Sequence, residues 1–302
     1  MNNKIKILIV GGTGFIGYHL AKRSLKEGWN VTSISTRRPK KLRYISKVKY
    51  IICDITKKNI LKKKINKNFD LVVNLGGYVD HSNKKKTYAS HYLGLKNLTS
   101  IFLKKPPKSF LQIGSGGEYG KSKSPHKETF KGKPLSVYYK AKLLSSLHLI
   151  KLFKLRKFPS TILRLYQAYG PRQDLNRFIP IIINSCIKNK KFPCSDGNQF
   201  RDFVFIDDVI EAIIKSLKNK KAKGEIFNIG SGKPIKIKNI IKYINKKIKK
   251  GQPLYGKIKL RKDEAIKTFP TIKKARNKLK WKPQISFETG LKKTINFYNE
   301  KI

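Results

Sequence analysis

The sequence predicts an α/β fold in which helices cover both faces of a doubly wound parallel sheet, with a smaller C-terminal lobe. Through the first half of the chain, short runs rich in β-branched residues alternate with segments of helical periodicity, a pattern typical of parallel strands joined by helices. The first run ends in closely spaced glycines that open a helical segment. The expected strands are 5–10, 30–35, 48–53, 70–75, 109–114 and 160–165.

The glycine cluster follows the first expected strand directly and reads Gly-Gly-Thr-Gly-Phe-Ile-Gly over residues 11–17. In a Rossmann-type fold, such glycines make the tight turn, let the backbone approach a pyrophosphate and let the helix pack on the strand. The N–H groups at the start of the helix then attract the anion. We therefore predict a dinucleotide site with contacts from Gly11, Gly14, Phe15, Ile16 and Gly17.

The end of the second expected strand bears on the choice of cofactor. Sites that bind NAD place an Asp or Glu about 20 residues past the glycines, on the ribose 2′-hydroxyl. Here hydroxyl residues lead into Thr36, Arg37 and Arg38, and there is no carboxylate. Because arginine suits a 2′-phosphate, we predict NADP bound by these three residues, with NAD as the alternative. The competing interpretation is that both arginines are ordinary surface residues.

The turn after the third expected strand is the last part of the predicted cofactor site. Asp54 stands just past that strand, followed by Ile55. Asp54 either reaches the adenine amino group or serves the turn itself, since Asp is a common turn residue. We assign both residues to the cofactor site.

A candidate catalytic set of three residues lies later in the chain. The expected strand 109–114 leads into Ser115, and ligands of open α/β sheets bind beyond the carboxyl ends of the strands. Tyr138 and Lys142 lie four residues apart, on one face of an expected helix. A nearby ammonium lowers the pKa of a phenol and makes it a usable acid and base. We therefore predict that Ser115, Tyr138 and Lys142 are catalytic.

The glycine turn, Ser115 and the Tyr138–Lys142 pair together resemble the extended short-chain dehydrogenase/reductase family, in its NAD(P)-dependent nucleotide-sugar epimerase/dehydratase/reductase branch. The resemblance implies that Tyr138 is the acid and base, and that Lys142 holds the nicotinamide ribose and tunes Tyr138. It also implies that Ser115 hydrogen-bonds the reacting oxygen. Further segments resemble this family in the family's own order: 163–171, 201–209, 227–232 and 279–291.

The same resemblance implies three further substrate-binding residues. Arg201 and Arg261 match positions that hold the nucleotide diphosphate, a task that suits the planar guanidinium group. Gln167 stands where many members have an Asn that contacts the substrate phosphate, and its longer amide can do the same. Ser115 completes the expected substrate contacts.

Some positions depart from the family pattern. His91 stands where Asn is frequent, so the local proton relay or helix geometry differs. The 4,6-dehydratases carry an Asp-Glu pair where this chain has Gly116 and Gly117. Glu118 comes one residue late, and along a strand-like segment its side chain points to the other side. We therefore expect no dehydratase activity.

These observations predict a dinucleotide-binding domain over 1–168, with a return through about 202–231, and a mainly substrate-binding lobe over 169–302. The expected activity is an NAD(P)-dependent oxidoreductase acting on a nucleoside-diphosphate sugar. A 4-keto-sugar reductase using NADPH is favoured by the arginine pair, the missing carboxylate and the modest length. The alternative is a 4-epimerase that retains NAD. A non-catalytic NADP-binding regulator is less favoured, because it needs no acid/base phenol.

The high positive charge of the chain makes nucleic-acid binding a third function to consider. Lys and Arg total 70 against 17 Asp and Glu, a formal net charge of +53. The basic residues are spread along the chain, and no zinc-finger spacing or RNA-binding aromatic signature accompanies them. We therefore interpret the charge as lysine at solvated positions, where its field helps to recruit an anionic substrate. A basic nucleic-acid-binding protein is less favoured, and no specific nucleic-acid partner is expected.

The remaining expectations concern the environment of the protein. Its three cysteines show no C-x-x-C spacing, so we predict neither a disulfide framework nor a metal site, as fits a reducing compartment. No apolar run approaches the length that spans a bilayer. We therefore expect a cytoplasmic protein with no membrane partner. From the family resemblance we also expect a homodimer through helices near 90–103 and 139–153.

Overall fold

A seven-stranded sheet forms the centre of the computed structural model, which describes residues 4–65, 68–78, 82–260 and 264–300. The strand order is β11-β6-β5-β4-β1-β2-β3, and all neighbours are parallel. The strands are β1 (Lys6–Val10), β2 (Asn30–Ser35), β3 (Lys49–Ile52), β4 (Leu71–Asn74), β5 (Ser109–Ser115), β6 (Ser160–Leu165) and β11 (Ile226–Ile229).

The predicted Rossmann-type fold is confirmed, and all six expected strands are present with ends shifted by at most one residue. The strand order reverses between β1 and β4, because the chain runs outward from β1 through β2 and β3 and then returns to β4. In open α/β sheets, ligands bind beyond the carboxyl ends of the strands at this reversal. The glycine turn after β1 and Ser115 at the end of β5 lie at this edge.

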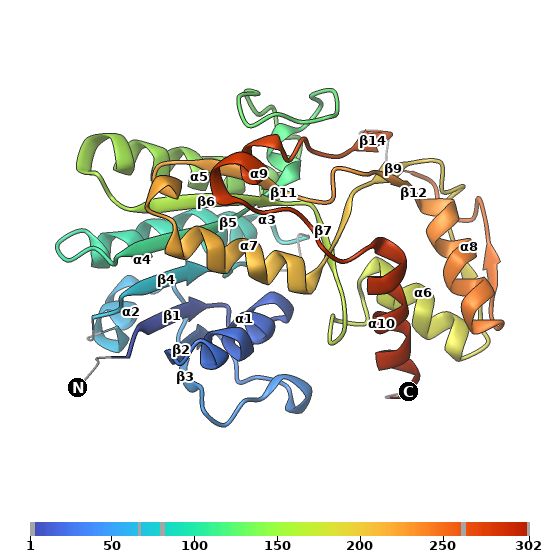
Figure 1. The fold of residues 1–302 in the computed structure, drawn as a ribbon, viewed down its shortest axis with the longest axis horizontal. Helices are drawn as coiled ribbons and strands as arrows, with labels where there is room; N and C mark the ends of the chain where they lie inside the picture. The colour runs from blue at the N-terminus through green and yellow to red at the C-terminus, as the bar shows by residue number, and fades with distance from the viewer. Residues whose placement is uncertain (1–3, 66–67, 79–81, 261–263, 301–302) are drawn as a thin grey trace.

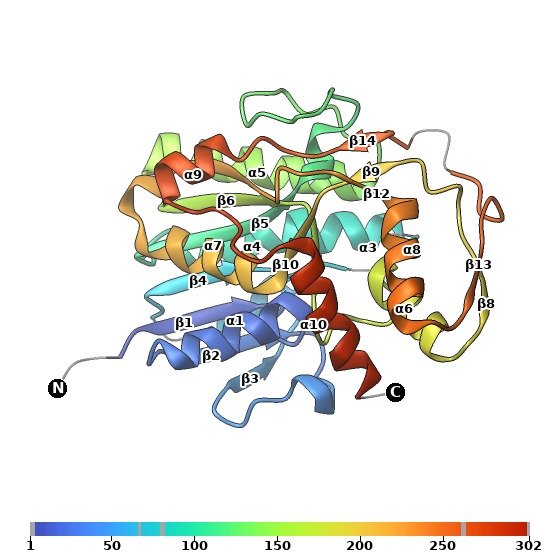
Figure 2. The ribbon, with the colours of Figure 1, turned by 45° about the vertical axis from the view of Figure 1, so that its right-hand side comes forward.

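Helices bury both faces of the sheet, as Figures 1 and 2 show. On β1, Ile7 and Ile9 enter one hydrophobic cluster while Leu8 and Val10 enter another, so every second side chain packs on the same face. A strand buried on both faces explains the continuous apolar run in the sequence. The helices over the sheet are α1 (Phe15–Lys26), α2 (Lys58–Lys64), α3 (Lys84–Tyr88), α4 (Gly94–Phe102), α5 (Val137–Arg156), α7 (Ile206–Lys218) and α9 (Lys273–Leu279).

The other elements build a smaller lobe, in which α6, α8 and α10 lie together beside the end of the sheet (Figure 1). Its helices are α6 (Phe178–Ile187), α8 (Ile237–Ile248) and α10 (Phe287–Asn299). Its short strands form three pairings: β7 (Gln167–Tyr169) with β10 (Phe203–Phe205), β8 (Lys191–Pro193) with β13 (Gln252–Leu254), and β9 (Phe200–Arg201) with β12 (Ile235–Lys236) and β14 (Lys267–Thr268).

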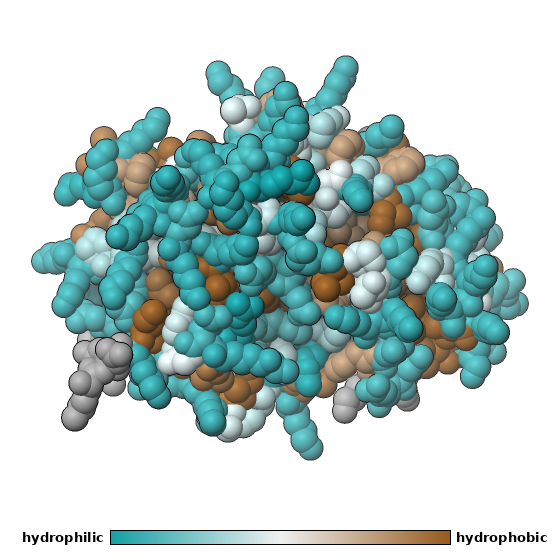
Figure 3. All heavy atoms as spheres, viewed as in Figure 1, coloured by the Kyte–Doolittle hydropathy of each residue, from teal (hydrophilic) through white to brown (hydrophobic). Residues whose placement is uncertain are grey.

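Several short helical turns connect these elements. A π-helical turn, η2 (Ala89–Leu93), joins α3 to α4, and three 3₁₀ turns are η1 (Lys41–Arg43), η3 (Gly116–Tyr119) and η4 (Lys220–Ala222). Hydrophilic side chains cover most of the face drawn in Figure 3, as the basic composition predicts. Within the described ranges, no helix combines the length and apolarity needed to cross a bilayer.

Candidate active site

A cleft of about 630 Å³ opens at the carboxyl edge of the sheet. It runs from the glycine turn, past the end of β5 and the start of α5, to the strands of the smaller lobe. The predicted site residues that line it are Gly11, Gly14, Phe15, Ile16, Gly17, Ser115, Tyr138, Gln167 and Arg201. Tertiary structure therefore brings the predicted cofactor, catalytic and substrate residues to one cavity.

The glycine turn has the shape that a pyrophosphate needs. Gly11 adopts a φ of +81°, and a Cβ atom on Gly17 would lie 2.4 Å from the Gly11 carbonyl oxygen. No side chain caps α1 at Gly14, and the first turn of α1 holds no acidic residue. The N–H groups and the positive end of the helix dipole thus face the cleft uncompensated. The residues at this end of the cleft fit a dinucleotide.

Ser115 ends β5 and begins the 3₁₀ turn η3. Its Oγ accepts a hydrogen bond from the Gly117 N–H at 3.2 Å, while the Ser115 N–H donates to Glu118 Oε1 at 2.8 Å. These two bonds form a capping box, which fixes the strand end at the mouth of the cleft. Ser115 is therefore held rigidly where it faces a ligand.

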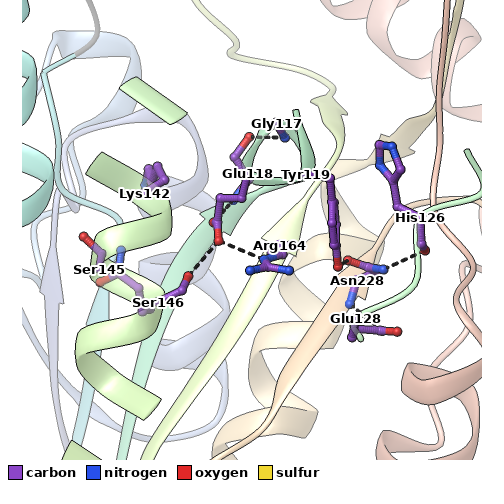
Figure 4. Close-up of polar contacts among 12 residues, drawn as sticks. Gly117, Glu118, Tyr119, His126, Glu128, Lys142, Ser145, Ser146, Arg164 and Asn228 are labelled. Carbon is purple, nitrogen blue, oxygen red and sulfur yellow. Dashed lines mark hydrogen bonds and ion pairs between the residues drawn. The ribbon is translucent and has the colours of Figure 1, made fainter. Parts of the chain in front are cut away.

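Glu118 faces the protein interior (Figure 4). Its Oε2 accepts hydrogen bonds from Ser146 Oγ and from Arg164 Nε, both at 2.8 Å, and the side chain is fully buried. We predict from the sequence that Glu118 points away from the site, but this prediction is based on a strand-like segment. The segment is a 3₁₀ turn instead, and it is the ion pair with Arg164 that holds the carboxylate away from the cleft.

Gly116 and Gly117 lie under two aromatic rings that line the cleft. A Cβ atom on Gly116 would lie 2.7 Å from Tyr166 Cζ, and one on Gly117 would lie 2.0 Å from Tyr139 Cε1. Any side chain at these positions must displace a ring. The chain therefore lacks the Asp-Glu pair of the dehydratases at these two positions, and the two rings occupy the space that such a pair would need.

Tyr138 and Lys142 lie on the first turns of α5, which Ser136 caps by accepting a hydrogen bond from the Tyr139 N–H. Lys142 is buried, and its Nζ donates to the Ile113 carbonyl at 2.7 Å and lies 5.9 Å from the Tyr138 ring centroid. Burial lowers the pKa of Lys142 to about 8, while the Glu118 carboxylate opposes this effect. The ammonium is thus fixed by β5 at the base of the predicted catalytic pair.

The pKa of Tyr138 differs from the sequence-based expectation. Although part of the side chain lines the cleft, burial of the phenol raises its pKa above the usual range. Tyr139 and Glu118 add to this increase, and Arg177 opposes it. Lys142 does not reverse it, because its Nζ bonds to the Ile113 carbonyl and lies over the ring. The predicted lowering of the Tyr138 pKa by Lys142 is therefore wrong.

His91 packs directly against the predicted catalytic phenol. Its ring lies edge-on to the Tyr138 ring, with centroids 4.9 Å apart, and Nε2 lies 3.2 Å from the Tyr78 carbonyl. The His91 carbonyl accepts a hydrogen bond from Ser145 Oγ on α5 at 2.8 Å. The π-helical turn thus carries His91 into the wall behind Tyr138, a position that the sequence marks only as a departure from the family.

Thr36, Arg37 and Arg38 lie outside the cleft lining. All three are exposed at the carboxyl end of β2, next to the glycine turn, where the Thr13 N–H donates to Ser35 Oγ at 3.3 Å. This location suits the ribose end of a dinucleotide bound across β1 and β2. It does not by itself distinguish a 2′-hydroxyl from a 2′-phosphate.

Asp54 and Ile55 have structural partners. Asp54 Oδ1 accepts a hydrogen bond from the Thr56 N–H at 2.8 Å, which is the turn role considered for it. Ile55 is 6% exposed and belongs to the hydrophobic cluster between the sheet and α4. Its carbonyl accepts a hydrogen bond from Asn97 at 3.1 Å.

The substrate end of the cleft holds Gln167 and Arg201. The Arg201 guanidinium pairs with Glu264 Oε1 at 2.6 Å and donates to the Phe200 carbonyl at 2.8 Å. Arg201 is thus anchored on β9 with its charged group at the cleft. Arg261, the second predicted diphosphate ligand, lies outside the described residues.

Comparison with known proteins follows this geometry. The sequence profile of the NAD dependent epimerase/dehydratase family matches residues 7–230. The chain belongs to this family. The UDP-glucuronate 4-epimerase of Thermodesulfobacterium geofontis is 30% identical over 318 residues, covering 98% of this chain and 96% of the relative. The family resemblance predicted from the motifs is confirmed.

Two solved structures of this family agree with the fold. The UDP-glucose 4-epimerase of Thermotoga maritima, with UDP-glucose, has a TM-score of 0.93 at 24% identity, covering 98% of this chain and 99% of that one. The UDP-glucuronic acid 4-epimerase of Bacillus cereus, with UDP-glucuronic acid and NAD, has a TM-score of 0.89 at 26% identity, covering 99% and 100%. This chain is accordingly an NAD-dependent enzyme of the nucleotide-sugar epimerase/dehydratase type.

Several side chains that line the cleft are not among the residues predicted from the sequence. Tyr139 and Tyr166 pack on the two glycines after Ser115, and Arg177 precedes α6. Tyr139 directly follows Tyr138, and Tyr166 lies within the family-like segment 163–171. For Tyr139 and Tyr166, a place in the sequence close to predicted residues is the only indication of a role, because their packing against the strand end depends on the tertiary fold.

Proposed function

We propose that this protein is a nucleotide-sugar 4-epimerase that retains NAD. The observation that carries the proposal is the strand end after Ser115, where Gly116 and Gly117 leave no room for an acid pair beside Tyr138 and Lys142. Such a site supports hydride transfer with proton transfer to one oxygen, without elimination of water. The two relatives named above with at least 25% identity are both 4-epimerases, one of them solved with NAD.

The choice of epimerase over reductase follows from the same comparisons. The reductase prediction depended on Arg37, Arg38 and a missing carboxylate as signs of NADPH. Both arginines are exposed, which supports the interpretation that they are ordinary surface residues of a chain rich in basic residues. NAD, the alternative cofactor, is the one bound by the B. cereus epimerase. We therefore propose NAD in place of NADP, held at the glycine turn and by Lys142.

The catalytic roles are part of this proposal. When bound, NAD supplies the acceptor and donor of the hydride. Tyr138 takes the proton from the sugar hydroxyl during oxidation and returns it during reduction, and Ser115 holds the same oxygen by a hydrogen bond. Lys142, fixed by the Ile113 carbonyl, holds a positive charge behind the phenol, which offsets only part of the cost of ionising the buried phenol of Tyr138. Between the two hydride transfers the keto sugar turns over, so the hydride returns to the opposite face of the planar carbonyl carbon and the configuration is inverted.

The substrate class follows from the relatives and the charged end of the cleft. Both 4-epimerases of at least 25% identity named above carry a UDP-sugar in their names. We propose a UDP-hexose or UDP-hexuronic acid whose diphosphate meets Arg201, with Gln167 beside it and Arg261 as a further ligand. The dinucleotide-binding domain at 1–168, with its return through about 202–231, would hold the cofactor, and the rest of 169–302 would mainly hold the substrate.

We also propose a homodimer through α4 and α5. Leu93 directly precedes α4 and Leu103 directly follows it, while α5 carries Leu144, Leu147 and Leu155; the exposed fractions of these leucines run from 36% to 67%. On α5 the three leucines lie on one exposed side of the helix and form a stripe that the exposed Lys151 interrupts. Solvent exposure of such a stripe favours burial against a second copy. A cytoplasmic location stays a prediction.

The test of the activity uses the purified protein with no added dinucleotide. We expect UDP-glucose or UDP-glucuronic acid to be converted to its C4 epimer, followed by proton NMR, and NAD to be released on denaturation. The control is Tyr138→Phe, which retains the fold and the bound nucleotide. Stoichiometric consumption of added NADPH with a 4-keto sugar, and no C4 inversion, would establish the reductase instead.

A further inference from the structure

The loop between β2 and β3 is fastened to the smaller lobe by a set of polar contacts. We name this set the clasp: Lys40, Leu42 and Arg43 on the loop, and Arg172 and Asp174 after β7. The two segments are 129 residues apart in sequence. In Figure 2 the loop after β2 reaches toward the lower end of α10. The clasp therefore joins the part of the molecule that carries the cofactor end of the cleft to the smaller lobe.

Arg43 is the centre of the clasp. Its Nε and Nη2 donate to the Arg172 carbonyl at 3.0 and 2.7 Å, and Nη2 lies 3.0 Å from Asp174 Oδ1. The Arg43 side chain is only 6% exposed. Lys40 lies 3.4 Å from the same carboxylate oxygen but is 71% exposed. Because an exposed ion pair contributes little, Arg43 supplies most of the connection.

The other side of the clasp is equally well anchored. The Arg172 guanidinium donates to the Leu42 carbonyl and lies over the Tyr18 ring of α1, 4.9 Å from its centroid. His19, also on α1, lies 3.0 Å from the Pro171 carbonyl, and the Tyr298 hydroxyl of α10 donates to the Gln173 carbonyl. Residues 171–174 are thus held by three separate elements.

The clasp borders the cofactor end of the cleft. Gln173 and Asp174 line the same cavity as Gly11, Gly14 and Phe15. Thr36–Arg38 follow β2, on which a dinucleotide in this fold places its adenosine end. The chain from β2 through Arg43 to Asp174 therefore forms a continuous bridge along one side of that end.

We infer that the clasp holds the cofactor end of the cleft closed and slows the exchange of bound NAD. This inference depends on the proposed function, because an epimerase regains its oxidised cofactor in every cycle and works without releasing it. Opening the bridge separates the buried Arg43 guanidinium from a carboxylate and a carbonyl at once. Loss of charge-assisted hydrogen bonds of this kind changes an equilibrium by roughly tenfold or more.

The experiment measures the exchange of bound dinucleotide in the full-length protein. Holoenzyme is mixed with excess fluorescent 1,N⁶-etheno-NAD, and the exchange rate is followed by fluorescence. We expect Arg43→Ala to exchange about tenfold faster or more than the unmodified protein, and Asp174→Asn to exchange faster by a smaller factor. The matched control is Lys41→Met, an exposed neighbour in the same 3₁₀ turn, which should leave the rate unchanged.

Two outcomes overturn the inference. One is an unchanged exchange rate in Arg43→Ala. If that variant does not fold, the same result in Asp174→Asn counts instead. Folding is judged from thermal unfolding of the nucleotide-free protein. The other is exchange in the unmodified protein that is complete within one catalytic turnover. Failure of the proposed epimerase is recognised separately, as absence of C4 inversion by the unmodified protein. The exchange measurement can then be repeated with whichever dinucleotide the protein binds.

Discussion

Tyr138 combines two properties at the scale of a single residue. Burial raises the pKa of its phenol, so the hydroxyl is protonated at neutral pH. Lys142 is held behind it by the Ile113 carbonyl. A protonated phenol suits the reduction half of an epimerisation, and the oxidation half needs the phenolate.

Replacement of Tyr138 by Phe tests its role as acid and base. The variant lacks the hydroxyl but fills the same space, so the fold and the binding of nucleotide should be retained. We expect kcat to fall by roughly 10² to 10⁴, the usual contribution of a positioned acid/base group. Turnover is measured by proton NMR, and nucleotide binding by calorimetry. Turnover close to that of the unmodified protein would falsify the assignment.

The buried Lys142 links catalysis to stability. Its pKa is about 8 in the folded protein and 10.5 as the ordinary value, so between these values the unfolded chain binds more protons than the folded one. Lys142 by itself should therefore add to the free energy of unfolding as the pH increases from about 8 to 10.5, by at most about 3 kcal/mol, while the buried tyrosines with raised pKa values oppose this rise near the upper limit. Below pH 8 the charged form is penalised by its burial.

Lys142→Met isolates this effect, since it removes the one titrating group and leaves the others. Urea unfolding at a series of pH values should show that the difference in the free energy of unfolding between the unmodified protein and the variant shifts in favour of the unmodified protein as the pH rises from about 8 to 10.5. Parallel curves for the two proteins would contradict a lowered pKa at Lys142. The variant should also lose activity at every pH, because no cation then supports Tyr138.

At the scale of elements, the connection from β5 to α5 shows how the site is kept in place. The turn η3 places Glu118 between β5, β6 and α5, where it bonds to the Ser115 N–H, Arg164 and Ser146. The carboxylate thus joins β5 and α5, which carry the proposed catalytic residues, to the neighbouring strand β6. Arg164 also lies over the Tyr119 ring, 4.5 Å from its centroid.

Removal of Glu118 should therefore be costly. Glu118→Ala leaves the Arg164 guanidinium buried without its carboxylate and the Ser115 N–H without its acceptor. We expect a loss of about 3 to 5 kcal/mol in the free energy of unfolding, the usual effect of breaking a buried ion pair. Urea denaturation measures it, and Glu300→Ala at the exposed end of α10 is the control. A loss below about 1 kcal/mol would show that the interaction is dispensable.

At the scale of the whole molecule, the sheet order places the cleft and α5 places the proposed dimer face. The helix that carries Tyr138 and Lys142 toward the cleft exposes Leu144, Leu147 and Leu155 elsewhere on its surface. An interface there would restrict movement of the catalytic helix. Assembly and catalysis would then depend on the same element.

A charge on the leucine stripe tests the dimer. Leu147 is 55% exposed, so Leu147→Glu should not disturb the monomer fold but should convert the proposed dimer to monomers. Analytical ultracentrifugation at micromolar concentration measures the mass. Ile258→Glu, at a 50% exposed position on the smaller lobe, should leave the mass unchanged. An unmodified protein that sediments as a monomer would reject the proposal.

Much of the fold could be predicted from the sequence, because its signals are local. The apolar runs mark the six strands, and the glycine spacing predicts the turn that lines the cleft. Tyr138 and Lys142 share a helix face because they are four residues apart. The carboxyl ends of parallel strands meet at one edge, so Ser115 could be placed beside the glycine turn.

Only the tertiary structure decided what lies around those residues. The Tyr166 and Tyr139 rings over Gly116 and Gly117, and the Lys142 bond to Ile113, join segments whose packing no local pattern encodes. The desolvation of Tyr138 likewise depends on every neighbour at once, which is why its pKa moves opposite to the expectation from Lys142 alone. Periodicity and turn chemistry act over a few residues, whereas side-chain contacts such as Arg43 with Asp174 form only when the chain closes over long separations.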